Sequence, residues 1–115
     1  MKVIIAGSRN FNDYDLLKVN ITRILQSIEG IEIVSGTARG ADQLGEQYAK
    51  EFKLTIKRFP ADWDKHGKAA GYIRNEEMAI YANVLIAFWD GVSKGTKHMI
   101  DLATKHGLTI HIIRY

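Results

Sequence analysis

Apolar and polar positions follow one another along the chain in segments typical of strands and helices. The runs Lys2–Ala6 and Asn83–Trp89 are the most continuously apolar, as expected for strands covered on both faces, and Ile31–Ser35 is a further strand. Leu54–Phe59 and Leu108–Ile113 alternate apolar with polar residues, which is typical of strands nearer a sheet edge. The pattern therefore predicts five strands.

Segments with helical periodicity separate these strands. The first is predicted to run from a cap at Asn12 or Asp13 to about Glu29, where Gly30 stops it. The other helices are expected over residues 43–52, over residues 73–82 and from the loop through Gly95 to about His106, and residues 60–72 are predicted to form a long loop.

The alternation of strands and helices predicts an α/β fold with a doubly wound parallel sheet and helices on both faces. The most continuously apolar strands belong at the centre, so the expected order is 3-2-1-4-5, with the switch point between the first and fourth strands. A length of 115 residues fits one domain over 1–115. Ligands of such sheets bind at the carboxyl ends of the strands near the switch point.

One turn at this edge carries the clearest chemical signal. Ser35–Asp42 (SGTARGAD) lies between a predicted strand and a predicted helix and contains Gly36, Arg39 and Gly40. Small residues there let backbone N–H groups approach a ligand, and the helix N-terminus behind them carries partial positive charge. Arginine adds a charged donor fork for phosphate or carboxylate. The turn predicts anion recognition, most simply of a nucleotide.

Other loops are expected to converge on the same edge. They are Gly7-Ser8-Arg9 after the first strand, the loop leading to Arg74-Asn75, and the segment Trp89–Lys97 with Asp90, Gly95 and Thr96. Arg74 and Lys97 fall in or near predicted first helical turns, where a positive charge is unfavourable by some tenths of a kcal/mol. Either an anionic ligand offsets that cost, or Glu76, Glu77 and Asp101 neutralise the two cations as surface pairs.

Aromatic residues and histidines leave two readings open. Trp63 lies in the long loop and either stacks on a base or packs the loop onto the domain, and Trp89 is a second candidate for contact with a base or ribose. The histidines show no metal-ligand spacing, so no metal site is predicted.

Composition excludes several function classes. An apolar fraction of 46% is enough for a core, and the absence of cysteine excludes disulfides and thiolate chemistry. The short apolar start and the lack of about 18 consecutive apolar residues favour a cytoplasmic protein without a leader or membrane span. A net charge of +3 allows an anionic partner without demanding nucleic acid.

Together these motifs resemble the SLOG superfamily, the Rossmann-like group that joins DNA-processing protein A and the Lonely Guy proteins, and among them the small stand-alone YspA-type proteins. The resemblance covers essentially the whole chain. It is carried by residues 6–9 (AGSR), 35–42 (SGTARGAD), 59–63 (FPADW), 67–71 (GKAAG), 74–75 (RN) and 87–91 (AFWDG), with Gly95-Thr96.

The resemblance implies a nucleotide or nucleotide-derivative ligand. Lonely Guy enzymes cleave the N-glycosidic bond of nucleoside monophosphates with a glutamate three residues after a glycine-threonine pair. Here Gly95-Thr96 and Arg74 match, but Met99 stands at the glutamate position, and the preceding proline-glycine-glycine is absent. Met99 can neither stabilise an oxocarbenium-like centre nor activate water. Asp90 and Glu77 are the catalytic candidates that remain, and Glu76 and Asp62 are further candidates of lower rank.

The favoured hypothesis is a binding module that senses or sequesters a small nucleotide, derived from NAD or ADP-ribose or used as a signal. A nucleotide hydrolase is the second hypothesis, and single-stranded DNA binding, as in DNA-processing protein A, is the third. No cofactor is assigned beyond a bound nucleotide, and the resemblance implies a homodimer or higher homo-oligomer. The expected ligand-binding residues are Gly7, Ser8, Arg9, Ser35, Gly36, Arg39, Gly40, Asp42, Trp63, Arg74, Asn75, Trp89, Asp90, Gly95 and Thr96.

Overall fold

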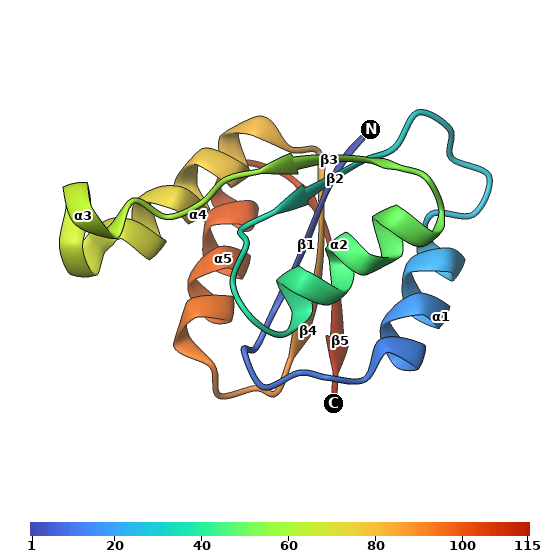
Figure 1. The fold of residues 1–115 in the computed structure, drawn as a ribbon, viewed down its shortest axis with the longest axis horizontal. Coiled ribbons are helices and arrows are strands. Elements are labelled where there is room, and N and C mark those ends of the chain that lie inside the picture. Colours follow the sequence, from blue (N-terminus) through green and yellow to red (C-terminus); the bar gives the residue numbers. More distant parts are fainter.

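A computed structural model describes residues 1–115 and contains one sheet of five parallel strands (Figure 1). The strand order is β3-β2-β1-β4-β5, as predicted. The connection from β3 to β4 crosses from one half of the sheet to the other, so β1 and β4 form the switch point. The strands are β1 (Lys2–Gly7), β2 (Glu32–Ser35), β3 (Thr55–Arg58), β4 (Val84–Trp89) and β5 (Thr109–Arg114).

Helices cover both faces of the sheet, α1 and α2 on one and α4 and α5 on the other (Figure 1). The short α3 lies beyond the start of α4, away from the sheet (Figure 1). The helices are α1 (Tyr14–Ile24), α2 (Ala41–Glu51), α3 (Trp63–His66), α4 (Ala70–Tyr81) and α5 (Lys94–Lys105), and a 3-10 turn η1 (Gly67–Ala69) joins α3 to α4.

Alternate residues of the central strands build two separate cores. Ile5 of β1 is buried with the residues of α1 and α2, whereas Ile4 is buried with those of α4 and α5. The same alternation holds in β4, where Ile86 faces the first core and Leu85 the second. Both faces are apolar because both are covered, which explains the continuous apolar runs of these strands.

The prediction of a loop over residues 60–72 is wrong from Trp63 onward, where α3, η1 and the start of α4 follow one another. Asp62 caps α3 by accepting a 3.0 Å hydrogen bond from the Lys65 N–H, and the helix ends at His66, followed by the C-cap Gly67, whose φ is +55°. Helix α4 begins at Ala70 instead of Ile73. Arg74 therefore lies in the second turn of α4, where the helix N-terminus repels a cation less than it does in the first turn.

The first helix is shorter than predicted. It ends at Ile24, and its C-cap Leu25 donates a backbone hydrogen bond of 2.9 Å to Ile21. Ser27 then adopts a left-handed φ of +67°, which breaks the helix before the predicted end at Glu29. Ile28 continues the apolar spacing but lies at the surface.

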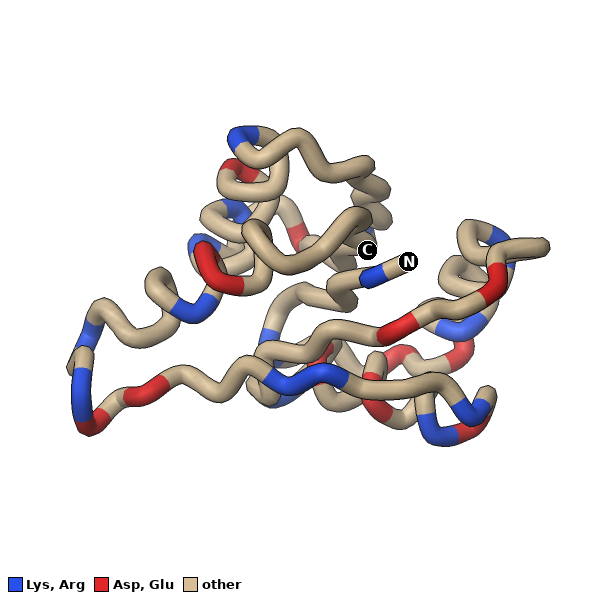
Figure 2. Tube along the Cα trace, turned by 90° about the horizontal axis from the view of Figure 1, so that it is seen from above, with Lys and Arg blue, Asp and Glu red and all other residues tan.

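The surface carries charges of both signs. Figure 2 shows Lys and Arg interspersed with Asp and Glu along the chain, in keeping with the small net charge of +3. None of the helices has the length and apolar character that crossing a membrane requires.

Candidate functional site

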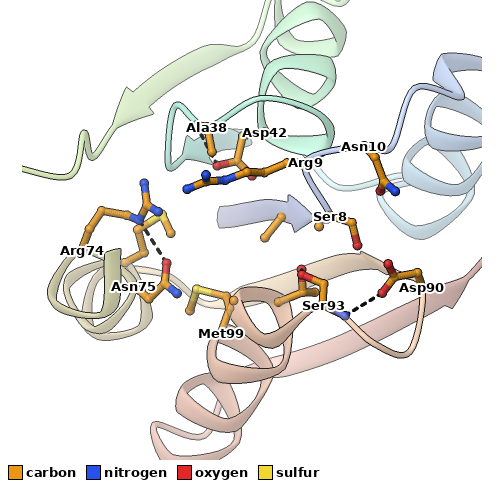
Figure 3. Close-up of a pocket in the computed structure, with 15 residues that line it drawn as sticks. Ser8, Arg9, Asn10, Ala38, Asp42, Arg74, Asn75, Asp90, Ser93 and Met99 are labelled. Carbon is orange, nitrogen blue, oxygen red and sulfur yellow. Dashed lines mark hydrogen bonds between the residues drawn. The ribbon is translucent and has the colours of Figure 1, made fainter. Parts of the chain in front are cut away.

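A cavity of about 450 Å³ opens at the carboxyl ends of β1 and β4 (Figure 3). This is the edge at which the strand order predicts a ligand site. Its walls come from the turn after β1, the start of α2, the middle of α4 and the first turns of α5. The lining residues are Ala6, Gly7, Ser8, Arg9, Asn10, Ala38, Asp42, Arg74, Asn75, Met78, Asp90, Ser93, Gly95, Thr96 and Met99.

The turn after β1 is held by its backbone and leaves a hydroxyl free. The Ser8 N–H donates to the Phe88 carbonyl at 3.2 Å, and the Ser8 carbonyl accepts from the Phe11 N–H at 3.1 Å. The Ser8 side chain is buried, with 3% of the residue exposed, and its Oγ has no hydrogen-bond partner. The hydroxyl still interacts weakly with the Asp90 carboxylate, whose pKa it helps to lower, but it makes no hydrogen bond of ordinary geometry and can take a better-placed acceptor.

The N-terminus of α5 forms the opposite wall. No side chain caps it at Ser93, so the first backbone N–H groups of the helix remain available. The buried Thr96 hydroxyl lies 3.3 Å from the Ser93 hydroxyl. A helix N-terminus with free donors attracts an anion, and here it faces the cavity.

Asp90 shapes the loop that leads into α5. Its Oδ1 accepts hydrogen bonds from the backbone N–H groups of Val92 at 2.9 Å and Ser93 at 2.8 Å. These bonds lower the pKa of the Asp90 carboxyl, so it stays ionised near neutral pH. A carboxylate held in this way positions the loop and is a poor general acid.

Arg74 enters the cavity from α4. Its Nε donates to the Asn75 side chain at 3.0 Å, and its Nη1 donates to the Gly36 carbonyl. Asn75 Nδ2 is in turn hydrogen-bonded to His98 Nδ1 at 3.2 Å, and this bond helps to hold the Asn75 side chain that Arg74 contacts. Burial lowers the pKa of Arg74, as does the nearby Arg9, whereas Asp42 raises it. The guanidinium is thus partly desolvated and faces a second cation (Figure 3).

Asp42 lies beneath the turn between β2 and α2. It is buried and accepts a hydrogen bond of 3.2 Å from the Ala38 N–H. Burial raises the pKa of Asp42 to about 6, although the Ala38 bond and the charges of Arg74 and Arg9 oppose the rise. The carboxyl therefore braces the turn and titrates just below neutral pH.

A second hollow of about 390 Å³ adjoins the cavity and shares Arg9, Ala38 and Arg74 with it. Trp63 contributes a side chain that is half exposed, at 51%. The full lining is Arg9, Gly36, Thr37, Ala38, Arg39, Pro60, Ala61, Trp63 and Arg74.

Most of the residues expected to bind the ligand lie in these two spaces. Gly36, Arg39 and Trp63 line only the hollow, and Arg9 and Arg74 line both spaces. The cavity alone is lined by Gly7, Ser8, Asp42, Asn75, Asp90, Gly95 and Thr96.

Other expected residues support the walls without lining them. The Ser35 hydroxyl donates to Glu46 at 2.7 Å, and Gly40 allows close packing, since a Cβ there would lie 2.3 Å from the Ser8 carbonyl oxygen. Trp89 Nε1 donates to the Ser93 carbonyl at 3.1 Å. Glu77, a catalytic candidate, is exposed on α4 and lines neither space.

The sequence reasoning did not select Asn10, Ala38 and Ser93 as ligand contacts, and it missed an apolar floor. Met99 and Met78 are buried and line the cavity, Met99 three residues after Thr96 on α5. Residues three apart on a helix lie on the same face. The position of Met99 three residues after Thr96 could therefore have indicated that Met99 also lines the cavity.

Comparison with known proteins places the chain in a sequence family. The protein is similar to the Gene 61 protein of Mycobacterium phage D29, with 38% identity over 119 aligned residues that cover 95% of this chain and 93% of the relative. The sequence model of the YspA, cpYpsA-related SLOG family matches residues 1–66, which include the turn after β1, the Ser35–Asp42 turn and Trp63. The protein belongs to this SLOG family.

Proposed function

We propose that the cavity binds a small nucleotide or nucleotide derivative, and that the protein acts as a sensor or sequestering module for it. Membership of the SLOG family supports a nucleotide-related function. A phosphate of the ligand would lie between the Ser8 hydroxyl and the N-terminus of α5, with Arg9 and Arg74 supplying positive charge.

The observation that carries this proposal is the buried Ser8 hydroxyl. It makes no hydrogen bond of ordinary geometry in the free protein, where Asp90 is a polar neighbour, and it borders the same cavity as the uncapped N-terminus of α5. A phosphate oxygen placed there would accept from Ser8 and from the helix N–H groups together. The cavity volume of about 450 Å³ is also in the usual range for small-molecule sites.

The first experiment measures the thermal stability of the protein with AMP, ADP-ribose, NAD, cyclic dinucleotides, GTP and a short single-stranded DNA. A ligand at about 100 times its dissociation constant adds about 2.7 kcal/mol, which raises the Tm of a domain of this size by about 10 °C or more. We expect a large shift with one small nucleotide and none of that size with DNA.

Two variants test the site itself. Ser8→Ala removes an unsatisfied hydroxyl, so the free protein should be as stable as the wild type or more stable, while nucleotide affinity falls about tenfold or more. Arg74→Ala should weaken binding as well, and Arg23→Ala on α1 is the control with the same charge change outside both spaces. The proposal is wrong if no nucleotide binds, or if Ser8→Ala binds nucleotide as tightly as the wild type.

A homodimer or higher homo-oligomer remains a prediction that follows from the resemblance to the SLOG proteins. The outer face of α4 supports it, because Ile73 and Ile80 are exposed at 36% and 66% and are spaced to share one side of the helix. Sedimentation of wild-type protein and of Ile80→Lys would test it, and a wild-type monomer would reject it.

A further inference from the structure

We propose that the hollow beside Trp63 is a second subsite, and that the preferred ligand is therefore a dinucleotide, with two nucleosides joined through phosphate. The inference rests on the proposed function and adds the class of ligand. One nucleoside would occupy the cavity, the linking phosphates would lie between Arg9 and Arg74, and the second nucleoside would lie against Trp63.

The first support is the way the two spaces meet. Arg9, Ala38 and Arg74 line both of them, so a ligand that extends from the cavity into the hollow passes along these residues. Cavity and hollow measure about 450 Å³ and about 390 Å³, so the hollow adds a space of similar size to the first. A mononucleotide in the cavity leaves that second space to solvent.

The second support is the charge at the junction. The Arg9 and Arg74 guanidinium groups are turned toward one another (Figure 3), and Arg9 lowers the pKa of Arg74. Buried Asp42 offsets part of this repulsion, because its charge raises the pKa of Arg74. Arg74 is half-buried and donates to the Gly36 carbonyl, so it cannot move freely into solvent. A phosphate between the two cations would relieve their repulsion, which makes the junction suited to the linking group of a dinucleotide.

The third support is the chemistry of the hollow. Its charged lining consists of Arg9, Arg39 and Arg74, with no acidic residue. Trp63 stands over the first turn of α4, where a methyl group on Gly71 would lie 3.6 Å from Trp63 Cη2 and 3.9 Å from Arg74 Nη2. The half-exposed indole is thus beside the junction, placed to stack on a base.

The wall opposite Trp63 is already ordered. Thr37 has a left-handed φ of +65°, and its N–H donates to the Ser35 hydroxyl at 3.1 Å. The next residue, Ala38, donates its N–H to buried Asp42. A turn fixed in this way offers a preformed surface, so binding in the hollow need not order the chain.

Calorimetry with AMP, ADP and diadenosine diphosphate tests the proposal step by step. ADP adds the second phosphate, and diadenosine diphosphate adds the second nucleoside with two identical ends. We expect diadenosine diphosphate to bind at least about tenfold more tightly than AMP, as one additional stacked base would give. Its binding should also quench the tryptophan fluorescence of the protein more than AMP does, and Trp63→Phe should remove that difference, since only Trp89 then remains.

Variants test whether the tighter binding of diadenosine diphosphate comes from the hollow. Trp63→Ala and Arg39→Ala should weaken diadenosine diphosphate binding about tenfold and change the Kd of AMP by less than about twofold. Trp63→Phe, which keeps an aromatic face, should recover most of the loss. Trp63 is outside both cores, so these variants should fold, and Lys65→Ala, on α3 but outside the hollow, is the matched control.

The outcomes separate the two proposals. If AMP binds in a Ser8-dependent way but diadenosine diphosphate binds no more tightly, the second subsite is wrong and the proposed function stands. The same conclusion follows if Trp63→Ala weakens both ligands equally. If none of the three nucleotides binds and no nucleotide of the thermal-stability panel raises the Tm, the proposed function fails and the second subsite fails with it.

Discussion

Two cations that look alike in the sequence have different surroundings in the structure. Lys97 is exposed and pairs with Asp101 one turn along α5, with 3.1 Å between Nζ and Oδ2. Arg74 pairs with neither Glu76 nor Glu77 and instead donates to the Gly36 carbonyl inside the site. The surface-pair interpretation is thus confirmed for Lys97, and it fails for Arg74, whose side chain is held inside the site by Asn75 and the Gly36 carbonyl.

The buried carboxyl of Asp42 predicts a dependence of stability on pH. Its pKa is about 6 in the fold against 3.8 in a model compound, so the folded state holds this proton more tightly. Between these two pH values stability falls as pH rises, and above about pH 6 the full cost of about 3 kcal/mol applies.

Asp42→Asn tests this, since an amide stays neutral and can still accept from the Ala38 N–H. We expect the wild type to lose up to about 3 kcal/mol relative to Asp42→Asn between pH 4 and pH 7. Urea denaturation of both proteins at unit pH steps measures the difference. A difference that stays constant over this range would show that Asp42 does not titrate there.

At the scale of elements, the strands could be predicted and the ends of some helices could not. Buried strands leave continuous apolar runs, and the parallel order followed from them. Helix α3 has no buried residue, so no apolar pattern could show it, and the Asp62 cap was its only signal. In α1 the apolar spacing continues to Ile28, but the left-handed Ser27 ends the helix before it.

The loop between β4 and α5 depends on the chain's last strand. Gly91 has a φ of +85°, and a Cβ there would lie 2.1 Å from Arg114 Nη2. Arg114, at the end of β5, lies over the Trp89 ring at 5.3 Å. The loop that carries Asp90 and Ser93 into the cavity wall is therefore packed against β5.

Gly91→Ala should destabilise the protein by about 1–3 kcal/mol through the left-handed backbone, because the exposed guanidinium at the end of the flexible Arg114 side chain can move away from the added methyl group. Adding Arg114→Ala should therefore recover little of the loss. Urea denaturation of the wild type, both single variants and the double variant gives the coupling. A loss that Arg114→Ala abolishes would show that the clash, and not the backbone conformation, carries the cost.

For the molecule as a whole, the position of the candidate site could be predicted from the strand order, but the residues that line it could not. The strand order placed the ligand edge beside β1 and β4, where the cavity lies. Yet three residues of the expected segments do not line the cavity. Ser35 and Trp89 use their side chains in hydrogen bonds to Glu46 and Ser93, and Gly40 packs against the Ser8 carbonyl. Neighbouring residues of one turn point in different directions, and only three-dimensional packing decides which of them face a ligand.

The distribution of charge over the whole molecule separates a nucleotide site from a DNA-binding surface. Charges of both signs are interspersed (Figure 2), and the arginines of the two adjoining spaces could contact only a few phosphates. For single strands the logarithm of affinity falls with that of salt concentration by about 0.7 per phosphate contacted. Diadenosine diphosphate should therefore lose less than about tenfold in affinity between 50 and 200 mM salt.

The comparison is a titration of diadenosine diphosphate and of a short oligothymidine at both salt concentrations, with Arg23→Ala as the control for bulk charge. We expect the dinucleotide to bind more tightly at each concentration, because the cavity volume of about 450 Å³ and the buried Ser8 hydroxyl suit a short ligand better than a continuous strand. Tighter binding of the oligonucleotide, with a slope of about −3 or steeper and displacement of the dinucleotide, would instead assign the arginines to DNA.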